Sequence, residues 1–161
     1  IKQYVRSQNF LQGIPHMAAL GVELVDFGPG TVTVKLPYVE KLVGNPDTGV
    51  LAGGAISALL DNACGSAVVA KTMKFASFAT LDLRIDYMKP AQPGQDVIAF
   101  AECYKLTRRI AFVRGVAYHE SRDKPIAHAA ATFMFTGRGT ISNLSDELEE
   151  VEKKTSQEAP E

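Results

Sequence analysis

The sequence contains little of what several protein classes require. It has no tryptophan, and two cysteines, Cys64 and Cys103, in 161 residues. Two thiols far apart in the chain provide no disulfide framework and fit a reducing compartment such as the cytoplasm. No apolar run approaches the roughly 20 residues of a membrane helix, and no basic segment followed by an apolar one opens the chain. Neither a membrane span nor a secretory leader is therefore expected.

An excess of charge of one sign is also missing, since 17 Lys and Arg stand against 18 Asp and Glu. Nucleic-acid phosphates or an anionic membrane would require a clear basic excess, so neither partner is expected. The balance hides an asymmetry, because residues 146–161 carry a net charge of −5 and residues 1–145 carry +4. We expect residues 141–161 to form an acidic tail, either a charged helix or disordered.

The sequence lacks the residue patterns of metal sites, serine hydrolases and nucleotide hydrolases. The three histidines, His16, His119 and His128, show no metal-ligand spacing with each other or with the cysteines, so no metal is expected. The chain contains no Gly-x-Ser-x-Gly elbow and no phosphate-binding Gly-Lys loop. Serine-hydrolase and nucleotide-hydrolase chemistry therefore have no support.

What is present is one long apolar helix among β segments. Residues 51–72, rich in Ala and Leu, predict a helix with apolar residues on several faces, which is typical of a helix enclosed by protein. A short helix is predicted over residues 2–12. Alternating patterns predict strands at 21–26, 31–36, 78–88, 97–106, 110–119 and 126–135. The last four are joined by short links and predict an antiparallel meander. The chain is expected to be one α+β domain over residues 1–140, with a sheet bent around one helix.

Asp61 is the most informative residue of that helix. It follows Gly54 and Ala58 and precedes Gly65 along one stripe, with Ser57 beside them, and every other member is small. A buried unpaired carboxylate costs several kcal/mol, so a neighbouring group or a function must justify it. Asp61 is therefore either a core residue whose carboxylate is hydrogen-bonded by a neighbouring group, or a catalytic carboxylate.

Gly53 and Gly54 open the same helix. Glycines permit close backbone approach at a helix N-terminus, where unpaired N–H groups and the helix dipole are electropositive. Such a site holds a carbonyl oxygen that becomes negative in a transition state, although two glycines also relieve crowding. Asp61 lies two turns further on, so the two groups are expected to meet at one ligand across a symmetric dimer.

The segment NPDTGVLAGGAISALLD, from Asn45 to Asp61, resembles the hot-dog-fold acyl-CoA thioesterases, in particular the phenylacetate-pathway (PaaI-like) branch. The resemblance extends to TLDLRIDYMKPA (80–91) and RRIAFV (108–113), and covers roughly residues 10–137. It implies a hot-dog fold and hydrolysis of an aryl or medium-chain acyl-CoA, without a separate cofactor. It also implies a homodimer or a dimer of dimers.

By this resemblance, Asp61 matches the catalytic acid, acting as general base or as nucleophile. The Gly53 and Gly54 positions match the backbone donors that polarise the thioester carbonyl. Asn45 matches a residue that positions water or substrate, although its loop is one residue longer than usual. Thr80 matches a position near the nucleophilic water.

One departure leaves the activity open. The family usually carries His before Gly-Gly, where this chain has Ala52. The alternatives are a slower enzyme, a non-catalytic acyl-CoA-binding protein and an engineered variant. A hot-dog hydratase acting on enoyl-CoA is a further alternative, because Asp123 and His128 have its Asp-x-x-x-x-His spacing, which we attribute to chance.

Basic residues are the candidate contacts for coenzyme A phosphates. Arg108 and Arg109 lie on a predicted turn, where a basic pair is usually just a solvated surface. The resemblance favours phosphate contacts for them, for which Arg offers planar bidentate donors. Lys89 and Arg138 are further candidates.

Overall fold

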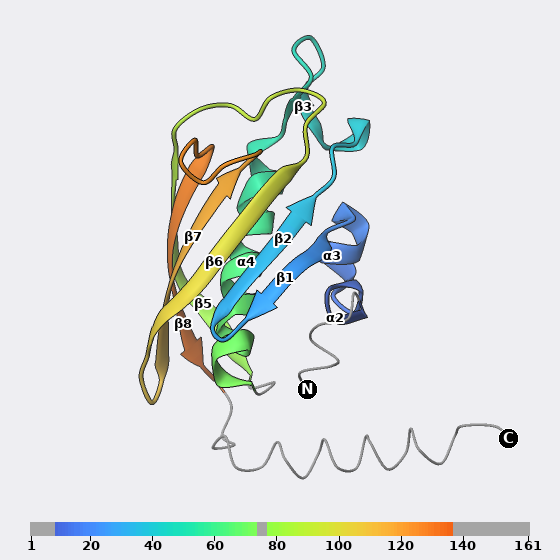
Figure 1. Cartoon of the computed structure of the whole chain (residues 1–161). Coiled ribbons are helices and arrows are strands. Elements are labelled where there is room, and N and C mark those ends of the chain that lie inside the picture. The colour runs from blue at the N-terminus through green and yellow to red at the C-terminus, as the bar shows by residue number, and fades with distance from the viewer. Residues whose placement is uncertain (1–8, 74–76, 137–161) are drawn as a thin grey trace, which may run out of the picture.

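The computed structural model describes residues 9–73 and 77–136 (Figure 1). It contains a six-stranded antiparallel sheet curved around the long helix α4, Gly53–Thr72. The α+β class and the wrapped helix are therefore confirmed. Arg138, the predicted tail, and residues 2–8 of the predicted first helix lie outside the described residues. The sheet strands are β1 (Glu23–Gly28), β2 (Thr31–Leu36), β5 (Phe78–Tyr87), β6 (Val97–Leu106), β7 (Ile110–Tyr118) and β8 (Ala127–Phe135).

Smaller elements surround this core. Two short helices, α2 (Asn9–Gln12) and α3 (Pro15–Leu20), precede β1, and the second of them was not predicted. The segment predicted as irregular between β2 and α4 contains a 3-10 turn, η1 (Glu40–Leu42). It also contains the small hairpin of β3 (Val43–Asn45) and β4 (Val50–Leu51). This hairpin leads directly into the first turn of α4.

The predicted meander is correct for three strands and wrong for the fourth. The strand order is β1-β2-β6-β7-β8-β5. The strand β5 pairs with β8 at one edge of the sheet, and β2 lies beside β6, where the meander predicts β5. The connection between β5 and β6, residues 88–96, is long enough to cross the end of the sheet, unlike the tight turn at 107–109. Alternation in the sequence indicates a strand but does not specify its partner.

The helix packs closely against the inner face of the sheet. A Cβ added at Gly115 on β7 would lie 3.1 Å from Sγ of Cys64 and 3.4 Å from Cδ2 of Leu60. By length and composition α4 is apolar enough to cross a membrane, but 67% of its apolar window is buried within the fold. It is the core helix, and its apolar character reflects enclosure by protein.

Candidate active site

The carboxylate of Asp61 is held by the neighbouring edge strand. Thr80, on β5, donates a hydrogen bond from Oγ1 to Oδ1 of Asp61 at 3.1 Å. No described residue forms a hydrogen bond to Oδ2 of Asp61. Asp61 is half-buried, and Thr80 is exposed. The structure thus brings these two predicted site residues together and leaves one carboxylate oxygen available to a water or a carbonyl carbon.

A pocket of about 190 Å³ opens beside this pair. Its floor includes Phe133 and Ser66, which are 2% and 3% exposed. Phe78 meets Phe133 edge to face, with ring centroids 5.6 Å apart. The remaining lining residues are Ile14, Asp61, Asn62, Gly65, Val69 and Thr80. The carboxylate therefore stands at the rim of a mainly apolar cavity that a hydrophobic group can occupy.

One polar atom in this pocket is notable. Oδ1 of Asn62 is buried and has no hydrogen-bond partner among the described residues. A buried acceptor without a donor costs about 1–3 kcal/mol, which favours a water or ligand group at this position. Asn62 was not singled out from the sequence, because an Asn in a helix gives no local sign of facing a cavity.

The start of α4 is exposed and has an unusual contact. Ala52 provides no side-chain cap, and both Gly53 and Gly54 are exposed. The hydroxyl of Tyr87, at the end of β5, donates to the carbonyl oxygen of Gly53 at 2.7 Å and lies 2.9 Å from Oγ of Ser57. Tyr87 was not predicted as a site residue. Its place within the family-like segment 80–91 was the only available signal.

Asn45 lies apart from Asp61, in the β3–β4 hairpin. Its Oδ1 accepts a hydrogen bond from the backbone N–H of Asp47 at 3.0 Å, and its backbone oxygen accepts one from Gly49 at 2.8 Å. These contacts define a tight turn stabilised by the Asn side chain. Among the described residues, Asn45 forms no hydrogen bond with Asp61, Thr80 or the glycines that open α4.

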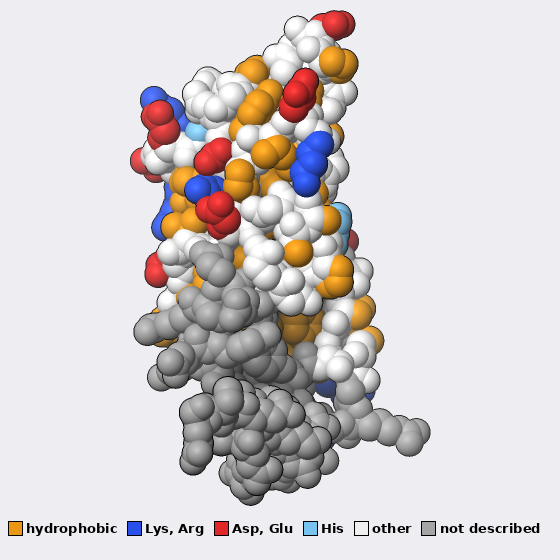
Figure 2. Space-filling view, turned by 90° about the vertical axis from the view of Figure 1, so that its right-hand side faces the viewer, with side chains coloured by type: hydrophobic (Ala, Val, Ile, Leu, Met, Phe, Trp, Pro, Cys, Tyr) orange, Lys and Arg blue, Asp and Glu red, His pale blue; other side chains and the backbone are white. Residues whose placement is uncertain are grey.

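The basic candidates lie at opposite ends of α4. The backbone oxygen of Arg109 accepts a hydrogen bond from Phe135, which pairs with Phe78 at the beginning of β5, near the C-terminal end of the helix. Arg108 precedes it in the same turn. Lys89 follows Tyr87 and therefore lies toward the helix N-terminus. On the face seen in Figure 2, acidic and basic side chains are interspersed with hydrophobic ones.

The residues of the hydratase spacing do not face α4. His128 is exposed and alternates with buried Ala127 and Ala129, so it projects from the outer side of the sheet. Asp123 lies in the β7–β8 connection, where its backbone N–H bonds Oγ of Ser121 at 3.2 Å. This arrangement agrees with a chance spacing. The described residues include no group of three or more His, Cys, Asp or Glu side chains placed to hold a metal.

Burial affects one thiol next to the site. Desolvation and, to a smaller extent, the negative charge of Asp61 together raise the pKa of the Cys64 thiol to about 12. Cys64 is 0% exposed and lies on the side of α4 that packs against the sheet. It is therefore a neutral core residue and not a nucleophile.

Known proteins share this fold. The family model of the thioesterase superfamily matches residues 48–126. A Pseudomonas aeruginosa protein of known crystal structure is 43% identical, with a TM-score of 0.73, over 80% of this chain and 96% of that one. The medium/long-chain acyl-CoA thioesterase YigI of Escherichia coli is 28% identical over 138 residues, 78% of this chain and 88% of that protein. The phenylacetic acid degradation protein PaaI of Thermus thermophilus, solved as a mutant, is 28% identical, with a TM-score of 0.66, over 76% of this chain and 99% of that one.

An antiparallel sheet wrapped around one long apolar helix defines the class of hot-dog proteins. Within that class, the chain belongs to the thioesterase superfamily and is a thioester hydrolase of the PaaI-like type. The family resemblance found from the sequence is thereby confirmed.

Proposed function

We propose that this chain hydrolyses an acyl-CoA, with an aryl or medium-chain acyl group, to the free acid and coenzyme A. The observation that carries the proposal is the Asp61 carboxylate, fixed by Thr80 at 3.1 Å, at the rim of a pocket of about 190 Å³. An apolar cavity of about 150 Å³ is large enough to bind benzene, so this pocket suits an aromatic ring or a chain of similar bulk.

Asp61 acts on the thioester carbonyl in one of two ways. As a general base it takes a proton from water, whose oxygen then attacks the carbonyl carbon. As a nucleophile it forms a mixed anhydride that water hydrolyses afterwards. In both cases the C–S bond breaks, the thiolate of coenzyme A is protonated, and the carbonyl oxygen carries negative charge in the transition state. Backbone N–H groups at Gly53 and Gly54 are suited to stabilise that charge.

One chain cannot supply both groups to one thioester. Eight residues separate Gly53 from Asp61, which corresponds to about 12 Å along a helix, whereas reacting groups must lie within about 3.5 Å. A second copy related by a two-fold axis solves this problem. Because β5 runs antiparallel to α4, with Thr80 at Asp61 and Tyr87 at Gly53, two copies joined at β5 have antiparallel helices. The helix start of one copy then lies near Asp61 of the other.

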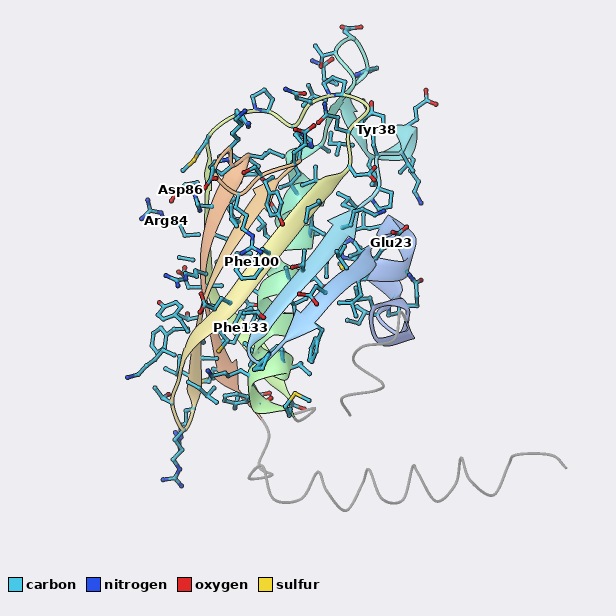
Figure 3. The ribbon with its side chains drawn as sticks, viewed as in Figure 1. Glu23, Tyr38, Arg84, Asp86, Phe100 and Phe133 are labelled. Carbon is cyan, nitrogen blue, oxygen red and sulfur yellow. The ribbon has the colours of Figure 1, made fainter. Side chains whose placement is uncertain are left out.

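The edge strands support this arrangement. β5 has ten residues and an open edge, and Leu81 on it is 51% exposed. Arg84 and Asp86, which form an ion pair at 3.1 Å, point away from the fold on that side, while Glu23 lies toward the other edge (Figure 3). Long exposed edge strands are usually paired or protected, and a second β5 would pair this one. Coenzyme A phosphates are then expected near Arg108 and Arg109 of one copy or Lys89 of the other.

The first test is a panel of aliphatic and aryl acyl-CoAs, with release of free thiol followed for each. The proposal expects turnover of at least one member and little turnover of acyl groups too large for the pocket. Binding of coenzyme A with no turnover across the panel would instead favour the non-catalytic acyl-CoA-binding protein that Ala52 suggests. Addition of water to an enoyl-CoA, without thiol release, would favour the hydratase.

The second test compares the two edge strands. Leu81→Lys places a charge on the β5 edge, and Val25→Lys is the matched control, because Val25 is 55% exposed on the β1 edge. Both residues lie at irregularities of their strand pairing. We expect Leu81→Lys to shift the dimer toward monomer in light scattering and to lower kcat, and Val25→Lys to change neither. A dimeric and fully active Leu81→Lys protein would exclude the β5 interface.

The third test concerns the phosphates. Arg109→Ala should raise KM for acyl-CoA more than it lowers kcat, because a contact to a remote phosphate stabilises ground state and transition state alike. An unchanged KM would leave Arg109 as a solvated surface residue.

A further inference from the structure

The first turn of α4 contains a cluster of hydroxyl groups that the reaction described above does not use. The phenol oxygen of Tyr87 lies 2.7 Å from the carbonyl oxygen of Gly53, and Oγ of Ser57 lies 3.1 Å from the same oxygen. The two hydroxyl oxygens are 2.9 Å from one another. Tyr87 reaches this position from β5, 34 residues away in the chain, so tertiary structure and not local sequence brings the group together.

The number of hydroxyl protons determines which groups of the cluster donate hydrogen bonds. Tyr87 and Ser57 have one hydroxyl proton each, and three contacts share these two protons. The shortest contact, 2.7 Å, is the one in which Tyr87 must be the donor, since a carbonyl oxygen only accepts. The proton of Ser57 then goes either to the phenol oxygen or to the same carbonyl. In both arrangements the carbonyl of Gly53 accepts a strong hydrogen bond from outside the helix ladder.

That carbonyl belongs to the same peptide unit as the N–H of Gly54. A peptide whose oxygen accepts hydrogen bonds is polarised, and its N–H becomes a better donor. N–H groups in the first turn of a helix have no acceptor within the helix, and no described residue accepts from the N–H of Gly54. A Cβ added at Gly54 would meet nothing within 4 Å, so a substrate atom has room to approach.

We propose that Tyr87, assisted by Ser57, is a positioning residue that orients and polarises the Gly53–Gly54 peptide so that the Gly54 N–H stabilises the oxyanion. This inference rests on the proposed thioester hydrolysis. The hydrogen bond from Tyr87 stabilises the first turn of α4, where Ala52 provides no side-chain cap. Tyr87 acts through the peptide and not on the thioester itself.

The test uses Tyr87→Phe in the full-length protein, with Ser57→Ala as a second variant and Tyr104→Phe as control. Tyr104 is 55% exposed and contacts Arg114 on the outer side of the sheet, away from α4. Because Tyr87 is itself 47% exposed, replacing it by Phe should leave folding intact. We expect Tyr87→Phe to lower kcat about fivefold, the loss of one neutral hydrogen bond, with KM unchanged. Ser57→Ala should have a smaller effect in the same direction, and Tyr104→Phe should have none.

A second readout separates this role from a merely structural one. With ¹⁵N-glycine labelling, the Gly54 amide resonance should move in Tyr87→Phe and stay in place in Tyr104→Phe. A lower kcat together with a shifted Gly54 resonance supports the proposal. An unmoved resonance overturns it, whether kcat falls or not, and so does an equal change in KM and kcat. If the wild-type protein hydrolyses no acyl-CoA, the proposed function fails, while the resonance still reports whether Tyr87 polarises the peptide.

Discussion

The two faces of helix α4 differ in burial and in the kinds of residue that form them. The buried face consists of side chains that are 0% exposed: Leu59, Leu60, Ala63, Cys64, Ala67 and Val68. The open face consists of Gly54, Ser57, Ala58, Asp61 and Gly65, all at least partly accessible. Both faces belong to one stretch of Ala-rich sequence, yet one contributes packing and the other contributes space and a carboxylate. Substitutions should therefore separate stability from activity according to the face they change.

Among the substitutions, the largest expected effect on stability lies on the buried face. Leu60→Ala removes a side chain that contacts β7 at Gly115, where glycine offers no atoms to fill the cavity. We expect the free energy of unfolding to fall by about 3 kcal/mol, within the range for Leu→Ala in a core. The measurement is urea denaturation at fixed protein concentration, since the stability of the proposed dimer would depend on concentration. The kcat of the folded fraction should stay within twofold, and a large loss there would show that the two faces are not independent.

The reverse pattern is expected at Asp61. Asp61→Asn keeps the shape of the side chain and the contact with Thr80 but removes the base, so kcat should fall on the order of 10²-fold or more. Coenzyme A binding and the free energy of unfolding should change little, because Asp61 is only half-buried. Steady-state kinetics and denaturation on the same preparation provide the check. Retained turnover in Asp61→Asn would remove Asp61 from the mechanism.

The sequence predicted the buried face better than the open one. Ala, Leu and Val at many positions of 51–72 are sufficient to predict an enclosed helix, and α4 begins at Gly53 and ends at Thr72 as expected within two residues. Asp61, Gly53 and Gly54 were found because a carboxylate and paired glycines are unusual inside such a helix. The hydrogen bond from Tyr87 and the lining by Phe133 depend on which strands meet α4. The edge position of β5 was not predicted, so these contacts could not be.

A pH experiment sharpens the contrast at Cys64, on the buried face. Burial raises the pKa of its thiol from an ordinary 9.0 to about 12. The unfolded chain therefore loses this proton first, and the free energy of unfolding falls as pH rises from about 9 to about 12. The decrease is at most about 1.4 kcal/mol per pH unit. Comparison with Cys64→Ala isolates it from other groups that titrate there, and identical slopes for the two proteins would contradict the assignment.

The smallest effect is expected at Gly65, where the open face conflicts with helix stability. Ala favours a helix over Gly by up to about 1 kcal/mol, and a Cβ at this position would lie 3.4 Å from Cε2 of Phe78, an ordinary contact. Gly65→Ala should therefore stabilise the protein by about 0.5–1 kcal/mol. The same methyl group narrows the pocket beside Asp61, so kcat/KM should fall a few-fold for the bulkiest acyl-CoA that is hydrolysed and stay constant for the smallest. Equal kcat/KM values across acyl groups, with the stability gain present, would mean that the acyl group does not occupy this pocket. Glycine at 65 is then explained by helix packing alone, whereas a size-dependent loss identifies it as the residue that trades stability for substrate space.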